Sequence, residues 1–140
     1  MRTHDGNNRA LNHRWDTDPD TTAFFSRFAR IHDALRPELE ALAAEAEQTG
    51  LPMVRHLMVE FPDDPETWPL SDQYMLGSDL LVAPALHEDQ EEREVYLPEG
   101  IWYDVWTGDS QQGPGWITHP APIGSPPVFS RGGDRTDLRA

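Results

Sequence analysis

Apolar residues recur every three or four positions between residues 24 and 46, and this spacing predicts an amphipathic helix. Pro37 interrupts the pattern, because a proline inside a helix lacks an N–H group and clashes with the preceding turn. We therefore expect two helices, over residues 20–35 and 37–48, or one kinked helix. The apolar positions are Phe24, Phe28, Ile31, Leu35, Leu39, Leu42 and Ala46.

Both ends of this helical region carry sequence signals. Asp18 precedes Pro19. An aspartate can accept hydrogen bonds from the first free N–H groups, and proline suits the first helical position. Gly50 can adopt the left-handed conformation that commonly ends a helix.

The next segment predicts buried strands. Residues 52–60 place apolar side chains on both faces of an extended chain, which favours a strand of a parallel barrel over a half-solvated antiparallel one. Four consecutive apolar residues, Leu80–Ala83, predict a second buried strand. Between them, the segment from Gln73 predicts a short helical turn that ends at Gly77. The order of loop, helix pair, strand, loop and short helix is typical of the last βα units of a barrel.

The pattern changes after residue 78, where helical periodicity stops. Short apolar runs separated by Gly, Pro and Asp predict antiparallel β structure, and we place a domain boundary near residues 77–79. The runs are Leu80–Ala83, Glu94–Leu97, Ile101–Val105, Trp116–His119 and Pro127–Phe129.

Composition narrows the possible functions. The 140 residues are too few for a complete (β/α)8 barrel, which needs about 250. The formal net charge of −14 argues against binding to nucleic acid, since an acidic chain repels phosphate. No segment reaches the roughly 18 apolar residues that span a membrane. The chain has no cysteine, and we expect a cytoplasmic location.

Motifs for metals and cofactors fail on inspection. Asp16, Asp18 and Asp20 have the spacing of a calcium loop, but Thr21 replaces the required Gly and Arg27 replaces the required Glu. A capped loop start is the favoured interpretation. The chain also lacks a His-Glu-x-x-His motif, a phosphate-binding Gly-Lys loop and a Gly-x-Ser-x-Gly elbow. We expect neither a metal ion nor a cofactor.

Several motifs together resemble glycoside hydrolase family 31. They are Gln73–Ala85, Phe61–Pro65, Val95–Pro98, Trp102-Tyr103-Asp104 and Trp106-Thr107-Gly108. The resemblance implies an α/β part followed by an all-β part. Residues 1–78 would be the C-terminal portion of a (β/α)8 barrel, and residues 79–140 an antiparallel β-sandwich domain. It also implies that the missing N-terminal part of the same enzyme contributes most of the catalytic machinery.

The same resemblance assigns two substrate-binding residues. Arg2-Thr3-His4 matches an Arg-x-His that lies at the C-terminal end of the seventh barrel strand in the family. His4 would hydrogen-bond hydroxyls of the sugar, because an imidazole can donate from one nitrogen and accept at the other. Arg2 would brace the strand end. From the residues alone, a histidine in a polar N-terminal segment is usually solvated.

Two segments look like the sulfoquinovosidase branch of the family, which removes 6-sulfoquinovose. These are the first 18 residues and Ala121–Phe129, although Asp5 stands where Glu is expected and residues 8–14 match loosely. The family performs retaining hydrolysis with two carboxylates. The motif that carries the nucleophile in the family is not found here. We therefore assign no catalytic residue and expect no activity from this chain alone.

Other interpretations stay open. The complete enzyme could be an α-glucosidase or a related α-glycosidase, or the chain could be a non-enzymatic module that binds carbohydrate or protein. Asp63 and Asp64 are expected to cap a loop. Trp102, Tyr103 and Trp106 are expected in the core rather than against a sugar. The barrel portion should leave an apolar flank uncovered, made of Phe24, Phe28, Leu35, Leu39, Met53, Leu57 and Val59.

Overall fold

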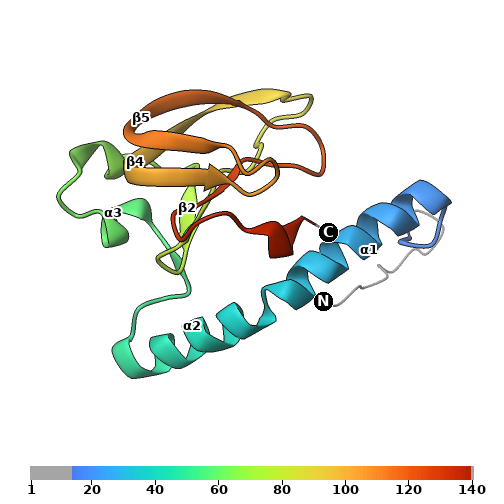
Figure 1. The fold of residues 1–140 in the computed structure, drawn as a ribbon, viewed down its shortest axis with the longest axis horizontal. Helices are drawn as coiled ribbons and strands as arrows, with labels where there is room; N and C mark the ends of the chain where they lie inside the picture. Colours follow the sequence, from blue (N-terminus) through green and yellow to red (C-terminus); the bar gives the residue numbers. More distant parts are fainter. Residues whose placement is uncertain (1–13, 140) are drawn as a thin grey trace.

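The computed structural model describes residues 14–139, which begin with two successive helices, α1 (Pro19–Ala34) and α2 (Arg36–Thr49). They run one after the other along one side of the molecule (Figure 1). The Asp18 side chain accepts a hydrogen bond from the N–H of Thr21 at 2.8 Å, and Gly50 ends α2 with a φ of 78°. The two predicted helices and both end signals are confirmed, with the break at Leu35.

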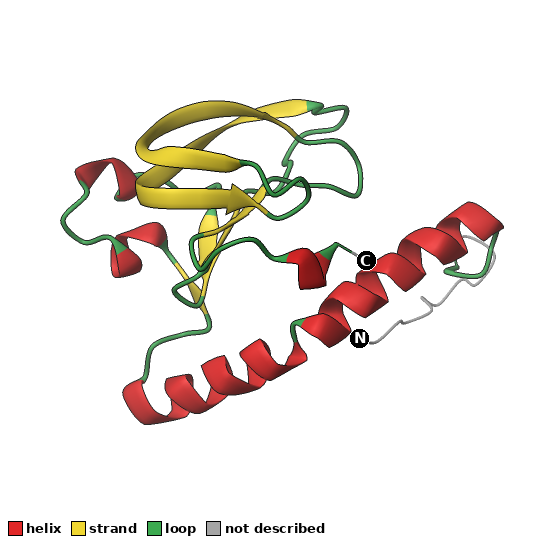
Figure 2. Cartoon of the chain, in the orientation of Figure 1, coloured by secondary structure: helices red, strands yellow, loops and turns green. Residues whose placement is uncertain are grey.

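A small β domain follows the helices (Figure 2). Within residues 14–139, six strands form one sheet in the order β1-β2-β3-β6-β4-β5, and all neighbouring pairs are antiparallel. No helix in this range is long and apolar enough to cross a membrane. The remaining elements are β1 (Val54–Arg55), α3 (Leu57–Glu60), η2 (Pro65–Thr67), β2 (Tyr74–Leu76), β3 (Leu80–Val82), β4 (Glu92–Asp104), β5 (Ser110–Pro120), β6 (Val128–Ser130) and η3 (Thr136–Leu138).

The strand predicted over residues 52–60 is wrong in length and in pairing. Only Val54 and Arg55 form a strand, and it pairs antiparallel with β2. The ring of His56 accepts a hydrogen bond from the N–H of Met58 at 3.2 Å and starts helix α3. In this short helix Leu57 turns inward, while Met58 is exposed. A run of apolar residues therefore fitted a helical turn as well as a strand.

The short helix predicted to end at Gly77 is also wrong. Tyr74–Leu76 is strand β2, and Gly77, with a φ of 59°, begins the turn into β3. A Cβ at this glycine would lie 2.6 Å from the side chain of Leu42, so the position favours glycine for two reasons. The predicted boundary between residues 78 and 79 falls within this hairpin, and the division into two domains stays a prediction.

The longest hairpin, β4–β5, carries a bulge. Leu97 pairs with Gly115 and Gly100 pairs with Gly113, so two residues of β4 face one residue of β5. The backbone of Gly113 lies so close to the Pro98 carbonyl that a side chain would clash with it. Two predicted runs, residues 94–97 and all but the last residue of 101–105, thus belong to one bent strand, whose end pairs with β6.

A side chain extends the hydrogen bonding of β4 where β6 does not reach. The amide of Gln73 donates to the Tyr96 carbonyl at 2.7 Å and accepts from the Tyr96 N–H at 3.0 Å. This is the pair of bonds that a neighbouring strand would otherwise make. Gln73 itself is buried.

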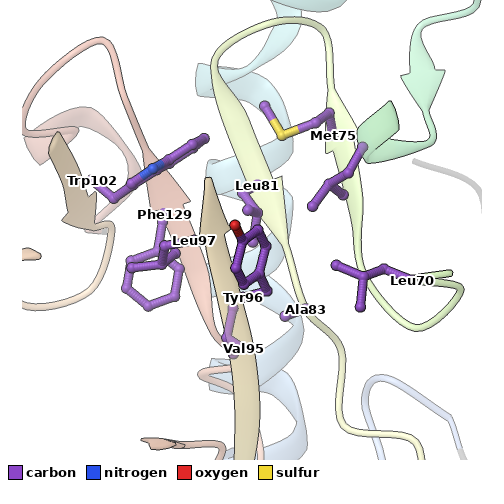
Figure 3. Close-up of a cluster of buried hydrophobic side chains, with 10 residues drawn as sticks. Leu70, Met75, Leu81, Ala83, Val95, Tyr96, Leu97, Trp102 and Phe129 are labelled. Atoms are coloured by element: carbon purple, nitrogen blue, oxygen red, sulfur yellow. The ribbon is translucent and has the colours of Figure 1, made fainter. Parts of the chain in front are cut away.

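The main core lies among β2, β3, β4 and β6 (Figure 3). Trp102 is completely buried there, as predicted, and its indole N–H donates to the Pro98 carbonyl at 2.8 Å. Leu57, predicted to lie on the uncovered flank, is completely buried in the same cluster. The cluster contains Leu57, Leu70, Met75, Leu81, Ala83, Val95, Tyr96, Leu97, Trp102 and Phe129.

The helices take little part in this packing. A second cluster joins Ile31 of α1 to Leu80, Val105 and Leu138, so α1 packs against η3 and one side of the sheet. Helix α2 buries no residue. The apolar stripe that predicted both helices is therefore covered on α1 only in part, and Phe24 remains 45% exposed.

Candidate functional site

The two residues that the sequence predicts to bind substrate, Arg2 and His4, lie outside the described residues. The segment that follows them has its acidic residues engaged locally. Asp16 pairs with Arg14 at 2.8 Å, and this hydrogen bond holds the pKa of Asp16 below its usual value. Asp18 caps α1. Within residues 14–139, no group of three or more His, Asp or Glu side chains is arranged to hold a metal ion.

A buried arginine gathers carboxylates at the beginning of the sheet. Arg55 is 2% exposed, and its guanidinium contacts Glu60 at 2.5 Å and Glu45 at 2.7 Å. It also donates to the Ser78 hydroxyl and the Pro52 carbonyl. The hydrogen bond to Glu60 is the largest cause of a raised pKa for Arg55. This network ties α2 and α3 to the sheet, so its role is structural.

A cavity of about 400 Å³ lies beside the loop that follows α3. The Tyr96 hydroxyl donates to Asp64 at 2.8 Å. Burial, together with this hydrogen bond and the nearby carboxylates, raises the pKa of Tyr96 to about 12. The tyrosine therefore stays protonated and acts as a donor, while the carboxylates accept. The lining residues are Glu60, Phe61, Pro62, Asp63, Asp64, Pro65, Tyr96, Glu99 and Pro114.

Asp64 has a second contact in this loop. Its side chain accepts from the N–H of Glu66 at 3.1 Å and so caps η2. The predicted capping role is confirmed for Asp64. Because one carboxylate both caps the helix and holds the tyrosine, the cavity wall is fixed before any ligand arrives. Such a wall can accept hydrogen bonds from hydroxyl groups.

A His–Asp pair at the far end of the sheet joins the partly buried His119 to the buried Asp104. The Nε2 of His119 lies 2.8 Å from the Oδ2 of Asp104, and its Nδ1 lies 2.8 Å from the Pro120 carbonyl oxygen. Asp104 also accepts from the N–H groups of Trp106 at 2.6 Å and Thr107 at 3.2 Å. The pair thereby joins the end of β5 to the turn after β4.

The surrounding groups shift the pKa values of both His119 and Asp104. The bond to Asp104 is the main cause of a raised pKa for His119, with burial opposing it. Burial alone would raise the pKa of Asp104, but hydrogen bonds from His119 and two backbone N–H groups hold it below its usual value. Both ring nitrogens face acceptors, so the imidazolium form fits this position. No nitrogen remains free for base catalysis.

Sequence reasoning missed both Arg55 and the His119–Asp104 pair. The carboxylate partners of Arg55 are 5 and 10 residues away, and Asp104 is 15 residues from His119. In the strand register His119 lies opposite Arg93 and Asp104 lies opposite Phe129 of β6, so the contact between them does not follow from strand pairing and has no local sequence signal.

Comparison with known proteins identifies the family. Residues 50–134 match the model of the glycosyl hydrolase family 31 C-terminal domain. The chain belongs to glycoside hydrolase family 31. Its homologues include two glycoside hydrolases of the sulfoquinovosidase type, and the resemblance to family 31 that the sequence predicts is confirmed. The antiparallel sheet is consistent with the β domain of the family.

Among family 31 proteins, two sulfoquinovosidases are similar over most of the chain. The enzyme of Escherichia coli (strain K12) is 43% identical over 131 residues, which are 94% of this chain and 19% of that protein. The enzyme of Agrobacterium fabrum is 41% identical over 94% of this chain and 20% of that protein. Alpha-glucosidase 2 of Bacillus thermoamyloliquefaciens is 35% identical over 80% of this chain and 14% of that protein.

A solved structure has the same fold over nearly the full chain. The family 31 sulfoquinovosidase from E. rectale, in complex with an aza-sugar inhibitor, superposes with a TM-score of 0.90 at 32% identity. The match covers 99% of this chain and 21% of that one. The chain thus spans about a fifth of the length of the relatives it matches.

Proposed function

We propose that this chain is the C-terminal part of a retaining α-glycosidase that hydrolyses α-sulfoquinovosides. The observation that carries the proposal is the extent of the match. The two sulfoquinovosidases align over 94% of the chain, whereas alpha-glucosidase 2 aligns over 80% at lower identity. The E. rectale sulfoquinovosidase supports the same reading, because its similarity extends over 99% of the chain.

In this proposal residues 1–78 complete a (β/α)8 barrel, and residues 79–140 form the domain behind it. Helix α2, with no buried residue, and the exposed side chains of Phe24 and Val59 support a missing partner, since surfaces of this kind are normally covered. In the same proposal His4 hydrogen-bonds the sugar, Arg2 belongs to the same substrate-binding motif and braces the strand end, and both catalytic carboxylates lie upstream.

A graft onto a related enzyme tests the proposal. In E. coli sulfoquinovosidase, the segment that aligns with this chain is replaced by residues 1–140, and hydrolysis of a para-nitrophenyl α-sulfoquinovoside is measured. We expect the graft to retain activity. His4→Ala in the graft should lower kcat/KM by about 100-fold, the loss expected for a substrate-positioning contact. The matched control His32→Ala, on the exposed face of α1, should leave kcat/KM unchanged.

Two outcomes count against the proposal. The substrate assignment is wrong if the folded graft is inactive while a parallel graft onto alpha-glucosidase 2 hydrolyses para-nitrophenyl α-glucoside, which favours the α-glucosidase alternative. The role of His4 is wrong if His4→Ala behaves like His32→Ala. The chain alone should hydrolyse neither substrate, because it carries neither catalytic carboxylate.

A further inference from the structure

A half-exposed tryptophan borders a hollow on the outer face of the β4–β5 hairpin. Trp116 is 49% exposed, and its ring lies 5.4 Å from that of Tyr96, its partner across the two strands. The hollow has a volume of about 300 Å³. Its lining combines this aromatic ring and one exposed leucine with polar side chains: Asp72, Leu86, His87, Gln90, Arg93, Glu94 and Trp116.

The walls of this hollow are fixed by hydrogen bonds. The side-chain oxygen of Gln90 accepts from the N–H groups of Leu86 and His87, at 2.9 and 3.3 Å, and so holds the loop that carries both residues. These contacts place the loop opposite β5 without help from a ligand. A binding surface that is ordered in advance loses less entropy when a ligand binds.

The floor is held by Arg93, which is 6% exposed. Its guanidinium donates to the Asp72 carboxylate at 2.7 Å and to the carbonyls of Asp72 and Pro84. The arginine is therefore occupied by the protein itself. Asp72 and Glu94, both exposed, lie at the rim of the hollow and can accept hydrogen bonds from a ligand.

We propose that this hollow binds one ring of a neutral oligosaccharide. An apolar face with hydroxyl groups around its edge is the surface that a pyranose ring presents. The ring of Trp116 and the side chain of Leu86 match the apolar face, and the carboxylates and His87 match the hydroxyls. The volume is at the lower end of small-molecule sites, which suits a single ring.

The charge of the site selects against anionic sugars. Two exposed carboxylates face the ligand, and the one arginine that lines the hollow is already paired with Asp72. A sulfonate or phosphate here would meet repulsion without a free cation. The inference stands or falls independently of the proposed function.

Titration of the 140-residue chain with maltotriose tests the inference. Binding is followed by the amide and indole N–H signals in two-dimensional NMR spectra. We expect shifts at the Trp116 indole and at residues of the 86–90 loop. Trp116→Ala should weaken binding by at least about tenfold, and methyl α-sulfoquinovoside should give no shift at this site.

Two further variants make the result specific. Trp68→Ala removes another exposed tryptophan, 58% accessible and outside the hollow, and should leave the affinity unchanged. Glu94→Gln preserves the size of the side chain and should reduce affinity by a few fold, so the inference does not depend on one variant folding. It is overturned if maltotriose causes no shifts, if Trp116→Ala binds as well as the parent, or if methyl α-sulfoquinovoside binds equally well.

Discussion

The sheet and the helix pair of this molecule have equally regular apolar patterns but bury them to different extents. Completely buried residues such as Trp102, Leu97 and Phe129 fill the sheet core. Helix α1 buries only Ile31, and α2 buries nothing. The comparison teaches that a local pattern determines which element forms, whereas burial depends on partners distant in the sequence.

The attachments of α2 to the rest of the chain are mostly polar. Glu45 contacts the buried Arg55, and Glu38 lies 3.0 Å from Arg135. An apolar side chain of α2, Leu42, also lies close to Gly77. Both ion pairs leave the α2 carboxylate partly exposed, and partly solvated ion pairs stabilise a fold less than apolar burial, so α2 should be the part whose order depends most on a covering surface.

The largest expected effect compares a core residue with a helix residue. Trp102→Ala should lower the free energy of unfolding by about 3–5 kcal/mol, because it leaves a cavity and frees the Pro98 carbonyl. Leu39→Ala on α2 should cost about 0.5–1 kcal/mol. Urea unfolding monitored by circular dichroism measures both. Equal losses of unfolding free energy for the two variants would mean that α2 is packed as tightly as the sheet core. The contrast between the two regions would then be wrong.

A smaller effect distinguishes the two carboxylates that contact Arg55. Glu60 is 12% exposed and Glu45 is 37% exposed. Glu60→Gln should cost about 2–3 kcal/mol, since it leaves a buried guanidinium less compensated. Glu45→Gln should cost less than about 1 kcal/mol. Urea unfolding measures both losses of stability. A larger loss for Glu45→Gln than for Glu60→Gln would show that α2 unfolds cooperatively with the sheet.

The smallest effect is the pH dependence of the sheet. The pKa of His119 is raised above 6.5, so its contribution to stability is complete below pH 6.5 and is lost as the pH rises through the raised pKa. The pKa of Asp104 is lowered below 3.8, so its contribution is present above pH 3.8 and lost as the pH falls through the lowered pKa.

Unfolding at about pH 5.5 and about pH 8.5 therefore reports on His119. The parent should lose stability at the higher pH, and His119→Gln should lose less. His87→Gln, at an exposed position in the 86–90 loop, serves as the control and should keep the parent's dependence. A parent whose stability is the same at both values would show that the pair does not contribute.

Much of the fold was predictable from local signals. The helices followed from a repeating apolar stripe with Asp18 at one end and Gly50 at the other. The strand runs after residue 78 followed from alternating short apolar segments and turn residues. The family followed from motifs with unusual combinations of Gly, Pro and aromatic residues. Each of these signals acts over a few neighbouring residues, so tertiary contacts did not override it.

The errors occurred where distant contacts decide the conformation. Leu57 lies in a helical turn and is buried in the main core, and Gly77 forms a hairpin turn against the side chain of Leu42. The candidate sites depended on the same kind of information. Trp116 meets Tyr96 through the register of the β4–β5 hairpin, whereas His119 meets Asp104 although the register places it opposite Arg93. The positions of Arg2 and His4 stay predictions, because they lie outside the described residues.

Gln73 carries a consequence for how this domain can vary. Backbone amides are supplied by almost any amino acid, so most rungs of a sheet survive replacement of the residues that form them. The two backbone hydrogen bonds at Tyr96 instead need a side-chain carboxamide of one particular length, that of Gln73. Exchange for glutamate would set a carboxylate oxygen against a carbonyl oxygen, and exchange for asparagine would fall short by one methylene. We therefore expect fewer substitutions to be tolerated at Gln73 than at Tyr96, the strand residue that it bonds.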